Sequence, residues 1–102
     1  SVIQLNRTGS DGDIAIFRKA GTTVGSIGTL SGDLYIGSSS GSGSALRFDG
    51  SNNIIYASNA SGSSRDAALD LGTSSVRFKD LHLSGAAYVP DVRSTGDQYF
   101  ND

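Results

Sequence analysis

The sequence contains no cysteine, methionine or tryptophan, only one proline, and no glutamate among its ten acidic residues. Without cysteine, neither a disulfide nor a thiolate metal site can form. Asp favours turns and strand ends whereas Glu favours helices, so an acidic set made only of Asp argues against long helices. A net charge of −2 supplies no basic surface for nucleic acid. No apolar run approaches the ~20 residues of a membrane span, so membrane insertion is not expected.

Large apolar side chains are also scarce for a chain of 102 residues. Leu, Ile, Val and Phe together number 24, against 32 Gly and Ser. A domain of this size buries only about two thirds of its unfolded surface even with an ordinary apolar content. Disorder is the weaker interpretation, because disordered chains are richer in Pro and charge and lack regular alternation of apolar and polar residues. We therefore predict that the chain completes its core with other copies of itself.

Short alternating runs, separated by Gly, Ser, Asn and Asp, predict an all-β fold. Residues 13–19 and 22–27 flank Ala20-Gly21 and predict a hairpin, and residues 53–57 follow a second turn. Four further runs share the form apolar–any–apolar with Gly within two positions, and they begin at Leu34, Leu46, Leu69 and Leu81. Their spacings of 12, 23 and 12 residues favour stacked short strands over a sandwich, which needs more large inward side chains. The expected fold is short strands in an elongated, intertwined homotrimeric β-prism or β-helix-like fibre.

The alternation slips once, between the apolar pairs Val76/Phe78 and Leu81/Leu83, because the step from Phe78 to Leu81 is three residues instead of two. We interpret the slip as a corner between two short strands, or as a β-bulge. The single histidine, His82, then points away from its apolar neighbours and is expected to be a polar-face residue. The predicted trimer core consists of Phe17, Leu34, Ile36, Leu46, Phe48, Leu69, Leu71, Phe78, Leu81 and Leu83.

Residues that could carry chemistry are few. The stretch from Ser10 to Asp13 lacks the ligand ladder of a calcium loop and predicts a turn. The pairs Asp66/Asp70 and Asp91/Asp97 could in principle serve glycoside hydrolysis, but ten Asp residues in a turn-rich chain make such pairs inevitable. We predict no catalytic residue, no metal site and no cofactor, and the chain is not expected to be an enzyme. The Gly/Ser-rich stretch 37–44 predicts a loose surface loop or linker.

Two stretches, LNRTGSDGDIAIFRKAGTTVGSIGT and RDAALDLGTSSVRFKDLHLSG, together with GDLYIG and ALRFDG between them, resemble segments of tailed-bacteriophage tail fibres and tailspikes. In that family the segments lie just upstream of an endosialidase-type C-terminal intramolecular chaperone. The chaperone drives trimerisation and then cuts itself off at a Ser that begins a Ser-Asp-x-Arg-Leu-Lys motif. The sequence has no such motif and reaches Asp102 without one, so the resemblance implies that Asp102 is a processing boundary.

The resemblance implies a homotrimer in the distal part of a virion tail fibre, with the chaperone domain as a partner before cleavage. Residues 1–85 are then a repetitive β fibre shaft, and residues 86–102 are a C-terminal tip segment. The expected function is structural and host-binding: adsorption to a bacterial surface glycan or outer-membrane receptor. Candidate receptor contacts, from the amphipathic aromatic and polar side chains of the tip, are Tyr88, Asp97, Tyr99 and Asn101. Two alternatives are part of a polysaccharide-degrading tailspike and a passive fibre stem without receptor contact.

Overall fold

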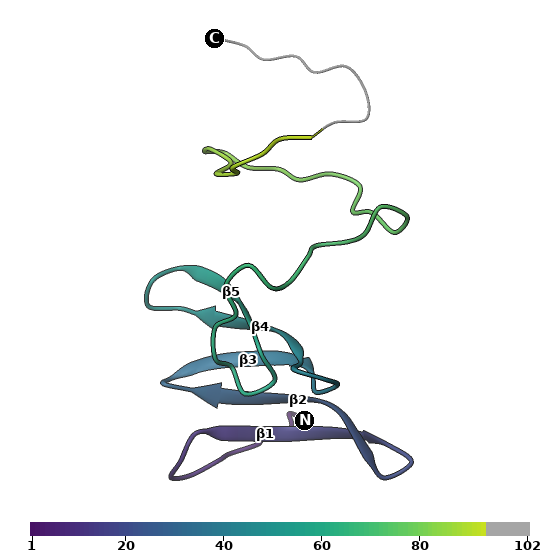
Figure 1. Cartoon of the computed structure of the whole chain (residues 1–102). Helices are drawn as coiled ribbons and strands as arrows, with labels where there is room; N and C mark the ends of the chain where they lie inside the picture. Colours follow the sequence, from purple (N-terminus) through teal and green to yellow (C-terminus); the bar gives the residue numbers. More distant parts are fainter. Residues whose placement is uncertain (94–102) are drawn as a thin grey trace. The chain divides into compact units, whose positions relative to one another are not determined.

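A computed structural model describes residues 1–93, and these residues form β-strands and no helix. The five strands are β1 (Gly12–Lys19), β2 (Thr22–Leu30), β3 (Asp33–Ser38), β4 (Ser44–Asp49) and β5 (Ile54–Ser58). They form one antiparallel sheet in which the strands lie side by side in chain order (Figure 1). The prediction of an all-β fold is confirmed. Within the described part of the chain, nothing resembles a helix that is apolar and long enough to cross a bilayer.

Two tight turns fix the register of the first three strands. Ala20-Gly21 joins β1 to β2 with φ angles of 48° and 81°, and Ser31-Gly32 joins β2 to β3 with 52° and 86°. Positive φ at both central residues defines a type I′ turn, whose twist matches the right-handed twist of the flanking strands. The hairpin predicted at Ala20-Gly21 is therefore confirmed, with Lys19 paired to Thr22.

The Gly/Ser-rich stretch 37–44 contains the predicted surface loop, but only over residues 39–43, and this loop is not loose. Its ends belong to β3 and β4, where Ser38 pairs with Ser44, so only five residues connect the strands. The Ser39 amide and hydroxyl donate to the carbonyls of Val24 and Thr23, at 3.3 and 3.2 Å. These bonds hold the connection against β2, because small polar residues can satisfy backbone groups locally.

One side of the sheet, which we call the apolar face, carries Ala15, Phe17, Ile27, Leu34, Ile36, Leu46, Phe48, Ile55 and Ala57. The register brings them into two rows across the strands. Ile27, Ile36, Leu46 and Ala57 are successive partners in one row, and Leu34, Phe48 and Ile55 are successive partners in the next. Directly opposed residues of antiparallel strands point to the same side. The alternation in the sequence therefore becomes a continuous surface of aliphatic and aromatic side chains.

The other side of the sheet, the covered face, contains the buried core. Tyr35 is 1% exposed, Ala45 is 4% exposed and Ser58 is fully buried. After β5 the chain folds back over this face as the covering loop (residues 59–65), which lies in front of the sheet in Figure 1. The ring of Tyr35 lies against Gly62, where a Cβ would approach the ring to 2.6 Å. The single-chain core is thus small and lies between the sheet and the covering loop.

Asn59 organises the covering loop. Its side-chain oxygen accepts the amide N–H groups of Ser61 at 2.9 Å and Ser63 at 3.1 Å. Two arginines hold the loop from the sheet side and from its end: Arg47 donates to the Gly62 carbonyl at 3.4 Å, and Arg65 donates to the Gly43 carbonyl at 2.6 Å. The loop is therefore held by polar contacts as well as by its packing on Tyr35.

Asn59→Ala is expected to lower the free energy of unfolding by about 1–3 kcal/mol, because it removes two hydrogen bonds of roughly 0.5–1.5 kcal/mol each. Urea unfolding measures the change. Ser61→Ala is the control, since the Ser61 side chain is exposed and only its backbone contacts Asn59. Equal losses in both variants would contradict an organising role for Asn59.

The contacts divide the chain into two units, residues 1–70 and residues 71–102. The described residues from 66 to 93 contain no strand, so the short strands predicted at 69–71, 76–78 and 81–83 are wrong. Instead, Thr73 closes a turn: its amide donates to the Val76 carbonyl and its hydroxyl accepts the Val76 amide, both at 2.8 Å. A strand needs a neighbour for its backbone groups, and no described segment pairs with these residues.

The face change between Phe78 and Leu81 is accordingly neither a corner between strands nor a β-bulge. Lys79 and Asp80 form an exposed ion pair at 3.4 Å, which contributes little to stability in water. His82 lies in an exposed segment without regular structure. The apolar side chains on both sides of the ion pair remain largely in solvent.

Candidate functional site

The apolar face is the most prominent candidate site on the described residues. Its large side chains are about half exposed: Phe17 52%, Leu34 43%, Ile36 44%, Leu46 42% and Ile55 64%. Because they are cross-strand neighbours, they form one contiguous patch. Contiguous patches of this kind mark binding surfaces or subunit interfaces, whereas single exposed apolar residues are ordinary.

Charge is nearly absent from this face: the alternation of β1 places Lys19, at the end of that strand, on the same side as Ala15 and Phe17. Strands β2 to β5 carry three charged side chains, Asp33, Arg47 and Asp49, and the register directs all three to the covered face beside Tyr35. Burying a charge in an interface is costly unless it is paired. A surface whose one charged side chain lies at the end of its outermost strand therefore suits burial against another apolar surface.

The charged groups of β3 and β4 on the covered face all have bonding partners within the chain. Arg47 donates to Asp33 at 2.8 Å, and its guanidinium lies 5.8 Å from the centre of the Tyr56 ring. Asp49 accepts hydrogen bonds from the amide and side chain of Asn52 and from the Tyr56 hydroxyl. The bonds from Asn52, with that from Tyr56, hold the pKa of Asp49 below its usual value. These groups stabilise the β4–β5 hairpin and form no obvious acid–base pair.

Tyr35 links β3 to β1 across the intervening strand. Its hydroxyl donates to Asp13 at 2.8 Å, and its ring passes over Gly28 of β2. A Cβ at Gly28 would overlap the Tyr35 side chain and lie 2.6 Å from the Gly12 carbonyl oxygen. Only glycine at this position allows the ring to reach Asp13. Burial, helped by the hydrogen bond to Asp13, raises the pKa of Tyr35 to about 12.

Because the pKa of Tyr35 is raised, part of the free energy of unfolding varies with pH in the alkaline range. The folded pKa lies above the unfolded value of 10.0, so folding favours the protonated phenol. The contribution is complete below pH 10 and is lost as the pH rises to about 12. Tyr35→Phe should therefore cost about 1.5–3 kcal/mol at neutral pH, the value of a hydrogen bond to a charged acceptor. Urea unfolding from neutral pH to pH 12 should show the two proteins converging, and a constant difference would contradict this linkage.

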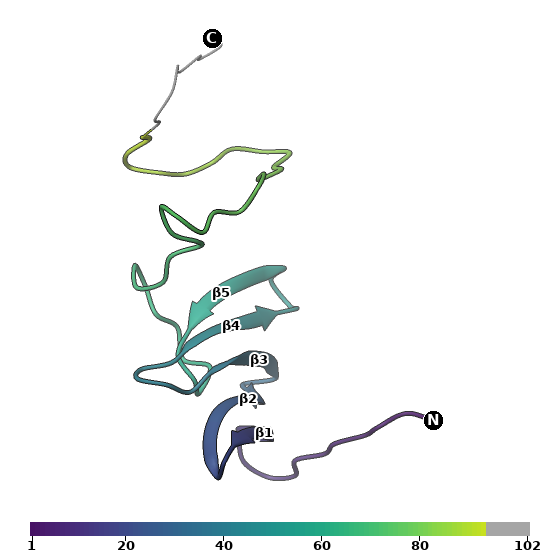
Figure 2. The ribbon, with the colours of Figure 1, turned by 90° about the vertical axis from the view of Figure 1, so that its right-hand side faces the viewer.

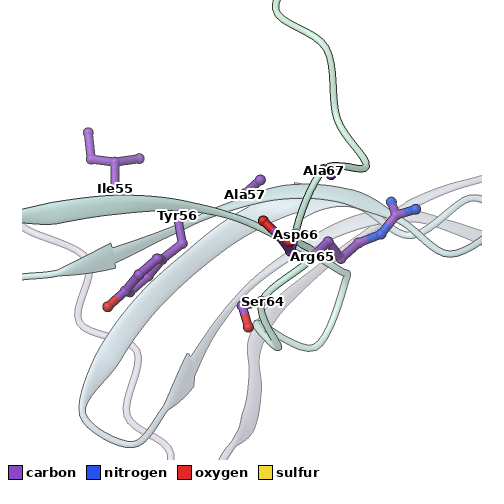
Figure 3. A pocket seen from close by; sticks show the side chains of 7 residues that line it. All are labelled: Ile55, Tyr56, Ala57, Ser64, Arg65, Asp66 and Ala67. Atoms are coloured by element: carbon purple, nitrogen blue, oxygen red, sulfur yellow. The ribbon is translucent and has the colours of Figure 1, made fainter. Parts of the chain in front are cut away.

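A hollow of about 440 Å³ lies beside β5, between Ile55, Tyr56 and Ala57 on the strand and residues 64–67 (Figure 3). Figure 3 shows the Arg65 side chain directed away from Tyr56. The Arg65 guanidinium donates to the Gly43 carbonyl, and the Tyr56 hydroxyl donates to Asp49. Because the two largest polar side chains at its border, Arg65 and Tyr56, bond to groups outside the lining, this hollow is a poor ligand site.

The residues predicted for a trimer core lie in two places. Phe17, Leu34, Ile36, Leu46 and Phe48 lie together on the apolar face. In the second unit, Leu71, Phe78 and Leu81 line one hollow of about 510 Å³. Leu69 is half-buried and Leu83 is exposed. Whether these residues meet other copies stays a prediction.

The predicted receptor contacts fall mostly outside the described residues. Tyr88 is 93% exposed. Asp97, Tyr99 and Asn101, and the predicted processing boundary Asp102, lie beyond residue 93. Among residues 1–93, no three His, Cys, Asp or Glu side chains gather closely enough to hold a metal ion.

Sequence reasoning missed Ile27 and Ile55 of the apolar face. An alternating pattern that includes Ile27 was present in the sequence, since Ile27 lies two residues from both Gly25 and Thr29. The nearby Gly25 and Gly28 weakened this strand pattern.

Compared with known proteins, the chain matches no family model, no curated protein and no solved structure.

Proposed function

We propose that this chain is a structural and host-binding segment of a trimeric bacteriophage tail fibre, in which three apolar faces form the shared core. The observation that carries the proposal is the contiguous and half-exposed apolar face, without a charged side chain on β2 to β5, opposite a covered face. The resemblance of the sequence to tail-fibre segments supplies the biological setting: a virion fibre, a bacterial glycan or outer-membrane receptor, and a C-terminal chaperone before cleavage.

The energetics favour association through this face. Full burial of a Leu, Ile or Phe side chain contributes about 1.5–3 kcal/mol. Five such side chains, each about half exposed, therefore leave roughly 4–8 kcal/mol per copy to be gained on burial. That gain is comparable to the whole stability of a small domain, about 5–15 kcal/mol. The small core of the single chain makes a partner for this face energetically important.

A three-sided prism suits the sheet. Neighbouring strands lie about 4.8 Å apart, so five strands in chain order extend about 19 Å along the direction in which they stack. Three such sheets around a common axis would direct their apolar faces inward and their covering loops outward. Stacked short strands and an apolar interior shared by three chains constitute the homotrimeric β-prism expected from the sequence.

Sedimentation equilibrium and cell binding test the proposal together. The purified chain should have three times the monomer mass of 10.5 kDa, and the fluorescently labelled trimer should adsorb to host bacteria. A monomer or dimer at micromolar concentration would contradict the trimer.

A passive stem is the second candidate, because Asp33, Arg47 and Asp49 bond to groups of their own chain on the covered face. A stable trimer that fails to adsorb to host cells would favour this reading. New reducing ends from host polysaccharide would instead indicate a tailspike depolymerase.

A further inference from the structure

The apolar side chains before β1 are, on average, more fully exposed than those of the sheet. Residues 1–6 contain no strand, and Val2, Ile3 and Leu5 are 83%, 88% and 60% exposed. No charged side chain occurs from Val2 to Asn6. The apolar side chains of this N-terminal segment (residues 1–6) therefore do not pack on an apolar surface of their own copy.

Arg7, the residue that directly follows the N-terminal segment, is fixed to the residues before and at the start of β1. Arg7 donates from Nε to the Ser10 carbonyl at 2.8 Å, from Nη1 to the Asp13 carbonyl at 3.0 Å and from Nη2 to the Ser10 hydroxyl at 3.2 Å. Figure 2 shows the segment, in purple, leading away from the sheet on the side opposite the covering loop. It therefore departs on the side of the apolar face, yet does not lie on its own sheet.

We propose that the N-terminal segment of each copy packs on the apolar face of a neighbouring copy, so that the chains of the oligomer exchange segments. The proposal rests on the proposed trimer and names the contact that joins its subunits. Six extended residues span about 20 Å, whereas facing sheets lie about 10 Å apart. The segment is thus long enough to cross to a facing sheet and lie along it.

The spacing of the side chains matches the face. In an extended chain, Ile3 and Leu5 point to the same side and are separated by about 6.7 Å along the chain. The two rows of the apolar face, one through Ile36 and Leu46 and one through Leu34 and Phe48, are also two residues apart along each strand. A segment running parallel to the strands would therefore place one side chain on each row. Neither the side chains of residues 2–6 nor these two rows carry a charge that would oppose the contact.

Disulfide trapping tests the exchange, because the natural sequence has no cysteine to compete. The full chain carrying Ile3→Cys and Leu46→Cys is prepared in ¹⁵N-labelled and unlabelled forms, which are mixed, unfolded, refolded and oxidised with oxidised glutathione. Peptide mass spectrometry then identifies the linked peptide that contains positions 3 and 46. We expect mixed-isotope linked peptides beside the two pure species, because the disulfide joins different copies.

A matched pair places the second cysteine at Ile16, which is 48% exposed and pairs with Ser26 on the covered face. This pair should give little linkage under the same conditions. If Leu46→Cys prevents refolding, Ile3→Cys with Ile55→Cys serves instead, since Ile55 lies on the same face.

The outcomes separate the two proposals. A trimer without linkage between positions 3 and 46, or with only single-isotope linked peptides, overturns segment exchange and leaves the trimer standing. Equal linkage at Ile16 overturns it as well, because the contact is then unspecific. A protein that sediments as a monomer overturns both proposals.

Discussion

Leu46→Asp is expected to abolish the trimer and leave monomers at micromolar concentration. Leu46 lies in the middle of the apolar face and is 42% exposed in the single chain. Each copy loses about 1 kcal/mol of apolar burial, and each of the three carboxylates then lies unpaired in a low-dielectric interface, at an effective cost of several kcal/mol per ion. Sedimentation equilibrium measures the loss of trimer directly.

Ile16→Asp is the matched control for this variant. Ile16 has a similar exposure of 48% but belongs to the opposite side of the sheet, because it pairs with Ser26, which alternates with Gly28 on the covered face. The same chemical change at this position should leave a trimer. Dissociation by both variants, or by neither, would contradict the apolar face as the interface.

Gly28→Ala is expected to destabilise the folded chain by about 3–5 kcal/mol, and so to remove most of its stability. The new methyl group overlaps the Tyr35 side chain and lies against the Gly12 carbonyl oxygen. Moving either the backbone or the ring to relieve this overlap costs free energy. Overpacking commonly costs about 1–3 kcal/mol, and displacement of the ring also breaks the hydrogen bond to the Asp13 carboxylate, a further 1.5–3 kcal/mol or so.

Gly50→Ala provides the comparison for this substitution. Gly50 lies in the β4–β5 connection, where an added Cβ meets no atom within 4 Å and no positive φ is required. Its free energy of unfolding in urea should change by less than about 0.5 kcal/mol, as for most surface substitutions. A mild effect at Gly28 would mean that Tyr35 can relax without leaving Asp13, which contradicts the packing described above.

The sheet was predictable because its information is local. Ala20-Gly21 lies between two alternating runs, and Leu34 and Leu46 each begin a run that ends near glycine. These patterns predict strand and turn without knowledge of the partner strand. The same alternation placed Phe17, Leu34, Ile36, Leu46 and Phe48 together as candidate core residues.

The same local pattern failed at Leu69 and Leu81. An apolar–any–apolar run before glycine occurs there too, but a strand forms only where a neighbour can accept its backbone hydrogen bonds. Sequence spacing does not say which segment supplies that neighbour. The strand pattern was therefore a necessary condition and not a sufficient one.

The covering loop was also beyond sequence reasoning. It depends on Asn59, which accepts two backbone N–H groups, and on Gly62, which gives room to the Tyr35 ring. Neither contact has a periodic signal, since both lie in a stretch of small polar residues. The contact between Gly28 and Tyr35 is similarly tertiary: the glycine has meaning only when the aromatic partner on the next strand is known.

The chain order of the strands has a consequence for assembly during synthesis. Each strand finds its hydrogen-bonding partners among its neighbours in sequence, and such short-range pairing favours fast folding. As the polypeptide emerges from the ribosome, β1 to β4 can pair before residues 59–65 have been made. The two rows of the apolar face then stay exposed to water until the chain meets other copies. The encounter between copies becomes the slow, concentration-dependent step. That interval is the one most vulnerable to aggregation, so a factor that brings nascent chains together would act there to greatest effect.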